Sequence, residues 1–102
     1  METEQSSSQN VNTTSASNYK LPSGITLQHC AKIAVVEDRP IMFDYWTPSC
    51  DKEVLIGVRE NGEKLLVKNE EEYTSPIAKV FKVKTDFIIE KENSLYLVDA
   101  EI

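Results

Sequence analysis

The pattern of apolar and polar positions changes abruptly near residue 23. Residues 1–23 are dominated by Ser, Thr, Asn and Gln, and the only large apolar side chains before Tyr19 are Met1 and Val11. A segment of this composition cannot bury enough apolar surface to offset the entropy that it loses on ordering. We therefore expect residues 1–23 to form a disordered tail and residues 24–102 to form a single domain.

The clearest local pattern within that domain predicts a β-hairpin over residues 54–68. Asn61 and Gly62 are the preferred central pair of a two-residue type I′ turn, because both residue types tolerate a positive φ angle. A two-residue turn fixes the register of the two strands. It places Val58 opposite Leu65, and we expect this apolar pair to lie on the buried face.

Three other stretches also read as strands. Residues 41–46 are rich in β-forming side chains and lie between Arg39-Pro40 and Thr47-Pro48, which interrupt regular structure. Residues 77–84 predict another strand, and residues 87–98 predict a second hairpin about a polar loop that contains Asn93.

The segment over residues 25–36 is ambiguous. Leu27, Cys30 and Ala34 belong to an apolar stripe with helical spacing, whereas the β-branched run over residues 33–36 favours a strand. We favour a strand because every later element is predicted to be β. The predicted fold is all-β: a small antiparallel barrel or sandwich of five to seven strands, of SH3-like or OB-like size, with a disordered N-terminal tail.

The composition of the chain argues against several classes of function. The chain has 102 residues, with 11 Lys and Arg against 17 Asp and Glu, so its formal net charge is -6. It lacks the basic excess that neutralises a nucleic-acid backbone, and no apolar run is long enough to span a bilayer. No secretory signal is visible, so we expect a cytoplasmic protein that is not secreted and whose two cysteines are free thiols.

The sequence predicts no enzyme, no metal site and no cofactor. One histidine and two cysteines twenty residues apart do not make a zinc signature, and no Gly-rich phosphate loop is present. His29 and Cys30 are adjacent, which suggests a nucleophile and its base, but neighbours on a strand point to opposite faces. A cysteine-dependent enzyme or redox protein built on Cys30 or Cys50 remains the second alternative.

The leading hypothesis is a non-enzymatic protein-interaction or structural module. Tyr45 and Trp46 are candidate partner-binding residues, although a lone Trp in a small domain more often caps the core. If Trp46 is buried, the remaining candidate surface is an unpaired strand edge, which the sequence cannot locate.

The first alternative is a single-stranded nucleic-acid-binding barrel that uses Lys79, Lys82 and Lys84. Phe81 lies among these lysines, but it shares a strand face with Ile77 and is therefore expected in the core. The acidic chain also makes nucleic acid the less favoured partner.

Three stretches of the chain resemble a known group of proteins. They are AKIAVVEDRPIMFDYW over residues 31–46, EEYTSPI over residues 71–77 and ENSLYLV over residues 92–98. Together they resemble short, uncharacterised proteins encoded by giant nucleocytoplasmic DNA viruses. The resemblance covers residues 21–102 and implies a virion or a cytosolic virus factory as the setting. It implies no activity, ligand or catalytic residue.

Overall fold

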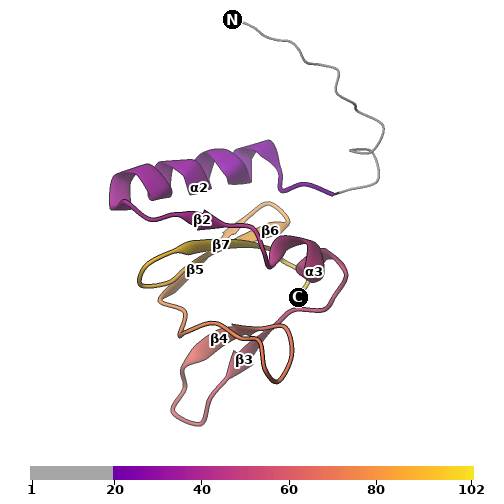
Figure 1. Cartoon of the computed structure of the whole chain (residues 1–102). Coiled ribbons are helices and arrows are strands. Elements are labelled where there is room, and N and C mark those ends of the chain that lie inside the picture. The colour runs from indigo at the N-terminus through magenta and orange to yellow at the C-terminus, as the bar shows by residue number, and fades with distance from the viewer. Residues whose placement is uncertain (1–19) are drawn as a thin grey trace, which may run out of the picture.

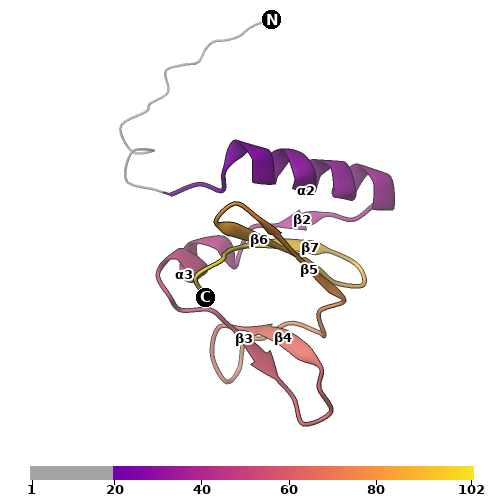
Figure 2. The same cartoon turned by 180° about the vertical axis from the view of Figure 1, so that it is seen from behind.

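A four-stranded sheet forms the middle layer of the structure, a computed structural model that describes residues 20–102 (Figure 1). Its strands follow the order β2 (Ile41–Met42), β7 (Leu95–Asp99), β6 (Asp86–Glu90) and β5 (Lys79–Val83). Helix α2 (Gly24–Glu37) covers one face of the sheet in both views, and the hairpin of β3 (Leu55–Val58) and β4 (Lys64–Val67) lies below the other face (Figures 1 and 2). The short helix α3 (Trp46–Cys50) packs against β7.

The sheet has a core on each of its two faces, because successive side chains of a strand point to opposite sides. On the side of α2, Ile88 and Leu97 pack with Cys30 of the helix and with Trp46. On the hairpin side, buried apolar residues of the two sheets meet those that precede α3 and β3; the cluster consists of Tyr45, Val54, Leu66, Ile89 and Val98. These two clusters account for the uninterrupted apolar runs in β6 and β7, since both faces of those strands are covered.

The C-terminal half follows the sequence pattern. The strand predicted over residues 77–84 is β5, and the predicted second hairpin is β6 with β7, in which Phe87 is opposite Val98. The backbone N–H of Lys91 donates to the carbonyl of Ser94 at 2.9 Å and closes the polar loop. These elements are confirmed.

Residues 24–37 are helical, so the prediction of a strand here was wrong. Ser23 caps the helix, because its side chain accepts a hydrogen bond from the backbone N–H of Thr26 at 3.1 Å. Only half of the run that favoured a strand reaches the core: Ile33 and Ala34 pack against the cluster on the α2 side of the sheet, whereas Val35 and Val36 are 81% and 72% exposed. The β-rich character is confirmed, but the fold is not all-β, and residues 20–102 form two separate sheets and no closed barrel.

The strand predicted over residues 41–46 is also wrong beyond its first two residues. β2 ends at Met42 and runs parallel to β7, not antiparallel to a neighbour. The chain then turns, and Trp46 begins α3. Pro48 fits because it is the third residue of that helix, where the backbone N–H has no partner within the helix.

The β3–β4 hairpin is present, but its register differs by one residue from the prediction. Within the hairpin loop only Gly62 adopts a positive φ, of 90°, and its N–H donates to the carbonyl of Arg59 at 2.9 Å. The loop therefore has three residues, and Val58 faces Lys64 instead of Leu65. The one-residue shift separates the expected apolar pair: Val58 is 66% exposed and Leu65 is 7% exposed.

We expect Gly62→Val to lower the free energy of unfolding by about 1–2 kcal/mol, because a β-branched residue is strained at positive φ. Chemical denaturation measures the change. Gly24→Ala is the control, since Gly24 lacks a positive φ and an added Cβ there meets nothing within 4 Å. That variant should stay within about 0.5 kcal/mol of the original chain. Equal effects at both positions would contradict the turn geometry.

Candidate functional site

Strand β5 is an edge of the main sheet, and among the described residues only β6 pairs with it. Its residues from Lys79 to Lys82 are exposed, and two of them are apolar: Val80 at 40% and Phe81 at 37%. In an antiparallel pair, alternate residues direct their backbone N–H and C=O groups away from the partner strand. The outer edge of β5 therefore presents main-chain donors and acceptors beside apolar side chains.

A groove of about 560 Å³ lies beside this edge, between β5 and α2. We call it the α2–β5 groove. It is lined by His29 and Ile33 of the helix, by Phe81, Lys82 and Val83 of β5, and by Ile88 of β6. Lys84, in the turn between β5 and β6, completes the lining. The groove thus has an apolar interior, with Lys84 lining it from the turn, whereas Lys82 borders it from β5 with its side chain on the opposite face of the strand.

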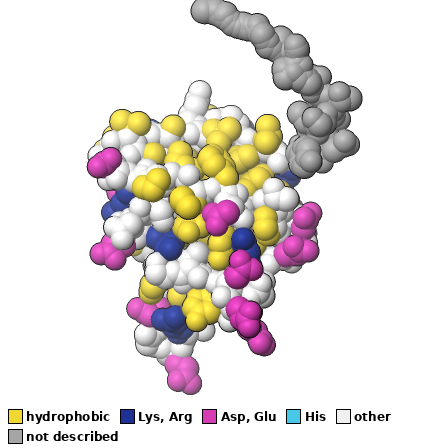
Figure 3. Space-filling view, viewed as in Figure 1, with side chains coloured by type: hydrophobic (Ala, Val, Ile, Leu, Met, Phe, Trp, Pro, Cys, Tyr) yellow, Lys and Arg dark blue, Asp and Glu magenta, His cyan; other side chains and the backbone are white. Residues whose placement is uncertain are grey.

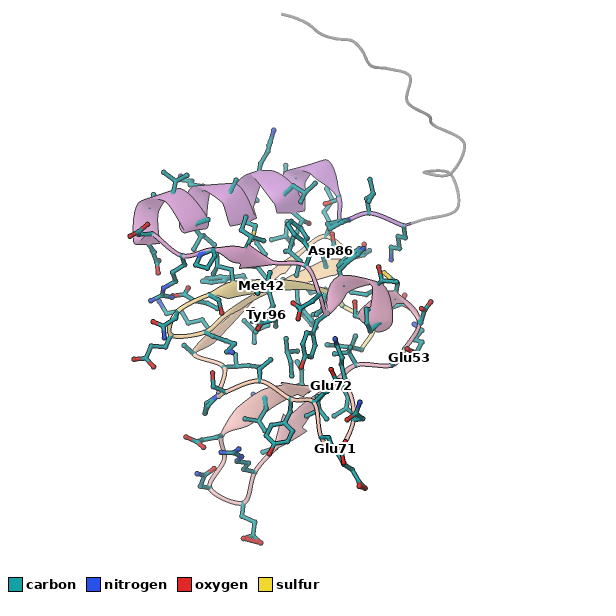
Figure 4. The ribbon with its side chains drawn as sticks, viewed as in Figure 1. Met42, Glu53, Glu71, Glu72, Asp86 and Tyr96 are labelled. Carbon is teal, nitrogen blue, oxygen red and sulfur yellow. The ribbon has the colours of Figure 1, made fainter. Side chains whose placement is uncertain are left out.

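Asp86 fixes the helix that forms one wall of this groove. Its Oδ2 accepts hydrogen bonds from the backbone N–H of Ser23 at 3.0 Å and from the hydroxyl of Thr26 at 2.8 Å. Thr26 Oγ1 also lies 3.3 Å from the carbonyl oxygen of Val83. Figure 4 shows Asp86 beneath the N-terminal end of α2. The start of the helix is therefore attached to the turn that ends β5.

Basic side chains surround the groove although the whole chain is acidic. Residues 73–85 contain Lys79, Lys82 and Lys84 and no acidic residue. None of these lysines forms an ion pair with another residue of the described segment. On α2, the exposed Lys32 lies three residues after His29, so the two side chains are neighbours on the helix surface. The structure thus brings the three predicted lysines to one strand and its turn.

Phe81 differs from the sequence interpretation, which assigned it to the core. The ring shares a face with Val83 and faces Ile88 across the ladder, but it lies on the edge strand and remains 37% exposed. An edge strand has no further strand beside it that could cover the ring. The position of a strand within a sheet depends on tertiary packing, so the apolar periodicity of the sequence does not reveal it. Phe81 is therefore available at the surface beside the lysines.

The candidate anchors Tyr45 and Trp46 are buried, at 6% and 5% exposure. They begin α3 at the end of the sheet, and their rings enter different clusters, Tyr45 on the hairpin side and Trp46 on the α2 side. The indole Nε1 donates to the carbonyl oxygen of Lys20 at 2.9 Å. This places Trp46 in the core, the alternative that the sequence had left open. It also shows that Lys20, within the predicted tail, contacts the domain, while residues 1–19 lie outside the described residues.

Cys30 is buried and Cys50 is half-buried. Cys30 is fully buried, whereas the adjacent His29 is exposed, so the pair suggested by the sequence is not assembled. Burial raises the pKa of the Cys30 thiol to about 11, and burial is also the main cause that raises the pKa of Cys50. Both are free thiols. A raised pKa lowers the fraction of each thiol that is ionised at neutral pH, and the ionised thiolate is the nucleophilic form.

We expect native Cys30 to react with an aromatic disulfide reagent at neutral pH at least about a hundredfold more slowly than the unfolded chain, because the reacting species is the thiolate. The Cys50→Ala variant isolates the Cys30 signal, and absorbance of the released thiol gives the rate. Reaction of native Cys30 as fast as that of the unfolded chain would contradict its burial and favour the cysteine-enzyme alternative.

A second cavity, of about 710 Å³, lies near the C-terminus and has mixed charge. Glu53 and Glu72, labelled in Figure 4, line it together with Lys52 and Lys68. Lys52 Nζ pairs with Glu101 at 2.5 Å, and Lys68 Nζ lies 4.4 Å from the centre of the Tyr45 ring. Both lysines of this cavity therefore already interact with other residues of the chain. Their charges do not indicate a particular ligand. Residues 20–102 contain no cluster of three or more potential metal ligands.

An apolar patch lies near β2, which is the outer strand of the main sheet on the side away from β5. Figure 3 shows apolar side chains gathered over α2 and β2. Exposed apolar residues of α2, of β2 and of the position after β2 include Val36 at 72%, Phe43 at 51% and Met42 at 37%. The patch has no groove among the cavities described above.

Comparisons with protein families, with characterised proteins and with solved structures give no match. Within residues 20–102, no helix has both the length and the apolar character needed to cross a membrane. The β5 edge and the α2–β5 groove are therefore the features that bear on function.

Proposed function

We propose that the protein is a non-enzymatic protein-interaction module that binds an extended segment of a partner along the outer edge of β5. The observation that carries this proposal is the unpaired edge of the main sheet, in which the residues from Lys79 to Lys82 are exposed. Addition of a strand to such an edge uses main-chain hydrogen bonds for affinity and side-chain pockets for specificity. The edge and the α2–β5 groove supply both.

The hairpin has another open edge, that of β3, which is the less suitable surface. β3 has four residues and contains Gly57, whereas β5 has five residues and no glycine. A glycine within a strand weakens it and provides no side chain for contact. The exposed apolar residues of β3, Leu55 and Val58, provide a matched control for experiments on β5.

Binding of single-stranded nucleic acid is the second candidate. It is supported by the three lysines, which have no ion-pair partner among residues 20–102, and by the exposed Phe81, on which a base could stack. The net charge of -6 opposes it, because non-specific binding depends on neutralising the phosphate backbone. The resemblance to viral proteins supports the proposal that either interaction takes place in a virion or in the host cytoplasm.

Selection of displayed random peptides on the full chain tests the proposed surface. We expect the selected peptides to bind the double variant Val80→Asp, Phe81→Ser at least about tenfold more weakly, since both side chains lie on the proposed contact edge. The control variant Leu55→Ser, Val58→Asp changes two exposed apolar residues of β3 in the same way and should bind normally. Failure to select peptides, or equal loss in both variants, would contradict the proposal.

A further inference from the structure

We infer that the partner segment is acidic and inserts an apolar side chain into the α2–β5 groove. This inference rests on the proposed function and specifies the chemistry of the partner. The outer edge of β5 provides the main-chain pairing, the groove provides the apolar pocket, and Lys79, Lys82 and Lys84 provide the charge. Each of these three features selects for a different property of the same segment.

The lysines favour an acidic partner over a second copy of this chain. Antiparallel pairing of β5 with β5 of another copy would bring lysines of the two strands near one another, and like charges across a strand pair are destabilising. Edge lysines are a known means of preventing such self-association. Glutamate or aspartate side chains on a foreign strand would instead meet lysines that have no ion-pair partner in the described chain.

The groove adds a requirement for one apolar side chain. Phe81 and Val83 lie on the face of β5 that is turned toward α2, and Ile33 of the helix and Ile88 of β6 line the same space. Side chains of an added strand alternate between the two faces of the sheet. Those on the α2 side therefore approach the groove, where an apolar group is removed from water.

An extended peptide also fits this site better than single-stranded nucleic acid. The exposed main-chain groups of an edge strand are spaced for another β-strand, and a nucleotide chain cannot pair with them along the edge. The aromatic rings that line the groove are Phe81 on β5 and the imidazole of His29 on α2, which belong to separate walls, whereas nucleic-acid surfaces stack successive bases on several rings. An extended peptide is therefore the proposed ligand of the β5 edge. A single-stranded oligonucleotide is included in the test as the alternative ligand.

Fluorescence anisotropy with three labelled probe peptides of about eight residues tests the inference on the full chain. Each peptide alternates Val or Phe with a second residue, which is Glu, Gln or Lys. We expect the Glu peptide to bind at least about tenfold more tightly than the Gln peptide, with an advantage that shrinks as salt is added. The Lys peptide should be the weakest.

Charge reversal identifies the lysines responsible. The double variant Lys82→Glu, Lys84→Glu should weaken binding of the Glu peptide by about tenfold or more and should bind the Lys peptide better than the original chain does. Arg59→Glu is the control for a charge reversal, because Arg59 is exposed at the tip of the β3–β4 hairpin. It should leave the affinity nearly unchanged. Circular dichroism establishes that each variant is folded.

The outcomes separate this inference from the proposed function. Equal binding of the Glu and Gln peptides, both abolished by Val80→Asp, Phe81→Ser, would overturn the acidic partner and leave the β5 edge as the binding surface. Binding of every peptide unaffected by changes in β5 would overturn both. A single-stranded oligothymidylate that binds as tightly as the Glu peptide, with the same dependence on Lys82 and Lys84, would overturn the peptide in favour of nucleic acid.

Discussion

Replacement of Trp46 by alanine is expected to lower the free energy of unfolding by about 3–5 kcal/mol. The ring is 5% exposed and packs in the cluster formed by Cys30, Ile88 and Leu97. Its removal leaves a cavity between α2 and the sheet, and it also removes the indole N–H that bonds the carbonyl of Lys20 at 2.9 Å. A loss of this size is a large part of the stability of so small a domain.

Urea denaturation followed by far-ultraviolet circular dichroism measures this change, because the variant has no other tryptophan to report fluorescence. Tyr73→Ala is the control, since that ring is 52% exposed, and it should cost no more than about 0.5 kcal/mol. In the original chain, Trp46 emission should be blue-shifted and resistant to quenchers. A Trp46→Ala variant as stable as the control would mean that the ring lies at the surface.

Asp86→Ala should lower the free energy of unfolding by about 3 kcal/mol, because hydrogen bonds to a buried charged group are the stronger ones. The carboxylate is 1% exposed and accepts from Ser23 N–H and from the Thr26 hydroxyl. Its loss leaves the Ser23 N–H without its acceptor, leaves the Thr26 hydroxyl with only the Ser23 hydroxyl and the more distant Val83 carbonyl as partners, and weakens the attachment of the N-terminal end of α2 to the start of β6. We therefore also expect weaker binding in the α2–β5 groove.

The same denaturation experiment measures the effect of Asp86, with two comparisons. Glu92→Ala removes an exposed carboxylate from the β6–β7 loop and should change stability by less than about 0.5 kcal/mol. Thr26→Val removes only the hydroxyl and should produce an intermediate loss. An Asp86→Ala variant as stable as Glu92→Ala would show that the helix is held to the sheet by its apolar contacts alone.

The sequence predicted the elements that depend on local pattern. The β6–β7 hairpin follows from two apolar runs about a polar loop, and β5 follows from a run of β-forming residues, so neither needs information from distant parts of the chain. The sequence also supplied the lysines of the candidate site. Their position on an edge strand follows from the strand order β2–β7–β6–β5, which is set by tertiary packing.

The predictions that were wrong have identifiable physical causes. The β-branched run over residues 33–36 outweighed the helical stripe in the prediction, whereas the structure has a helix that Ser23 caps and that buries Cys30 against the sheet. In the first hairpin, Asn61 does not adopt positive φ, so the loop gains one residue and the strand faces shift. The groove could not be foreseen because one of its walls is the helix that was predicted to be a strand.

The most direct test of the binding surface is amide chemical-shift mapping of the isotope-labelled full chain during titration with the Glu peptide. We predict the largest shifts over residues 79–84 of β5 and its turn, with a second group at His29 and Ile33 of α2. Shifts at Leu55 and Val58 of β3 should be small. Shifts confined to the apolar patch at Met42 and Phe43, or to the 710 Å³ cavity near the C-terminus, would contradict the account.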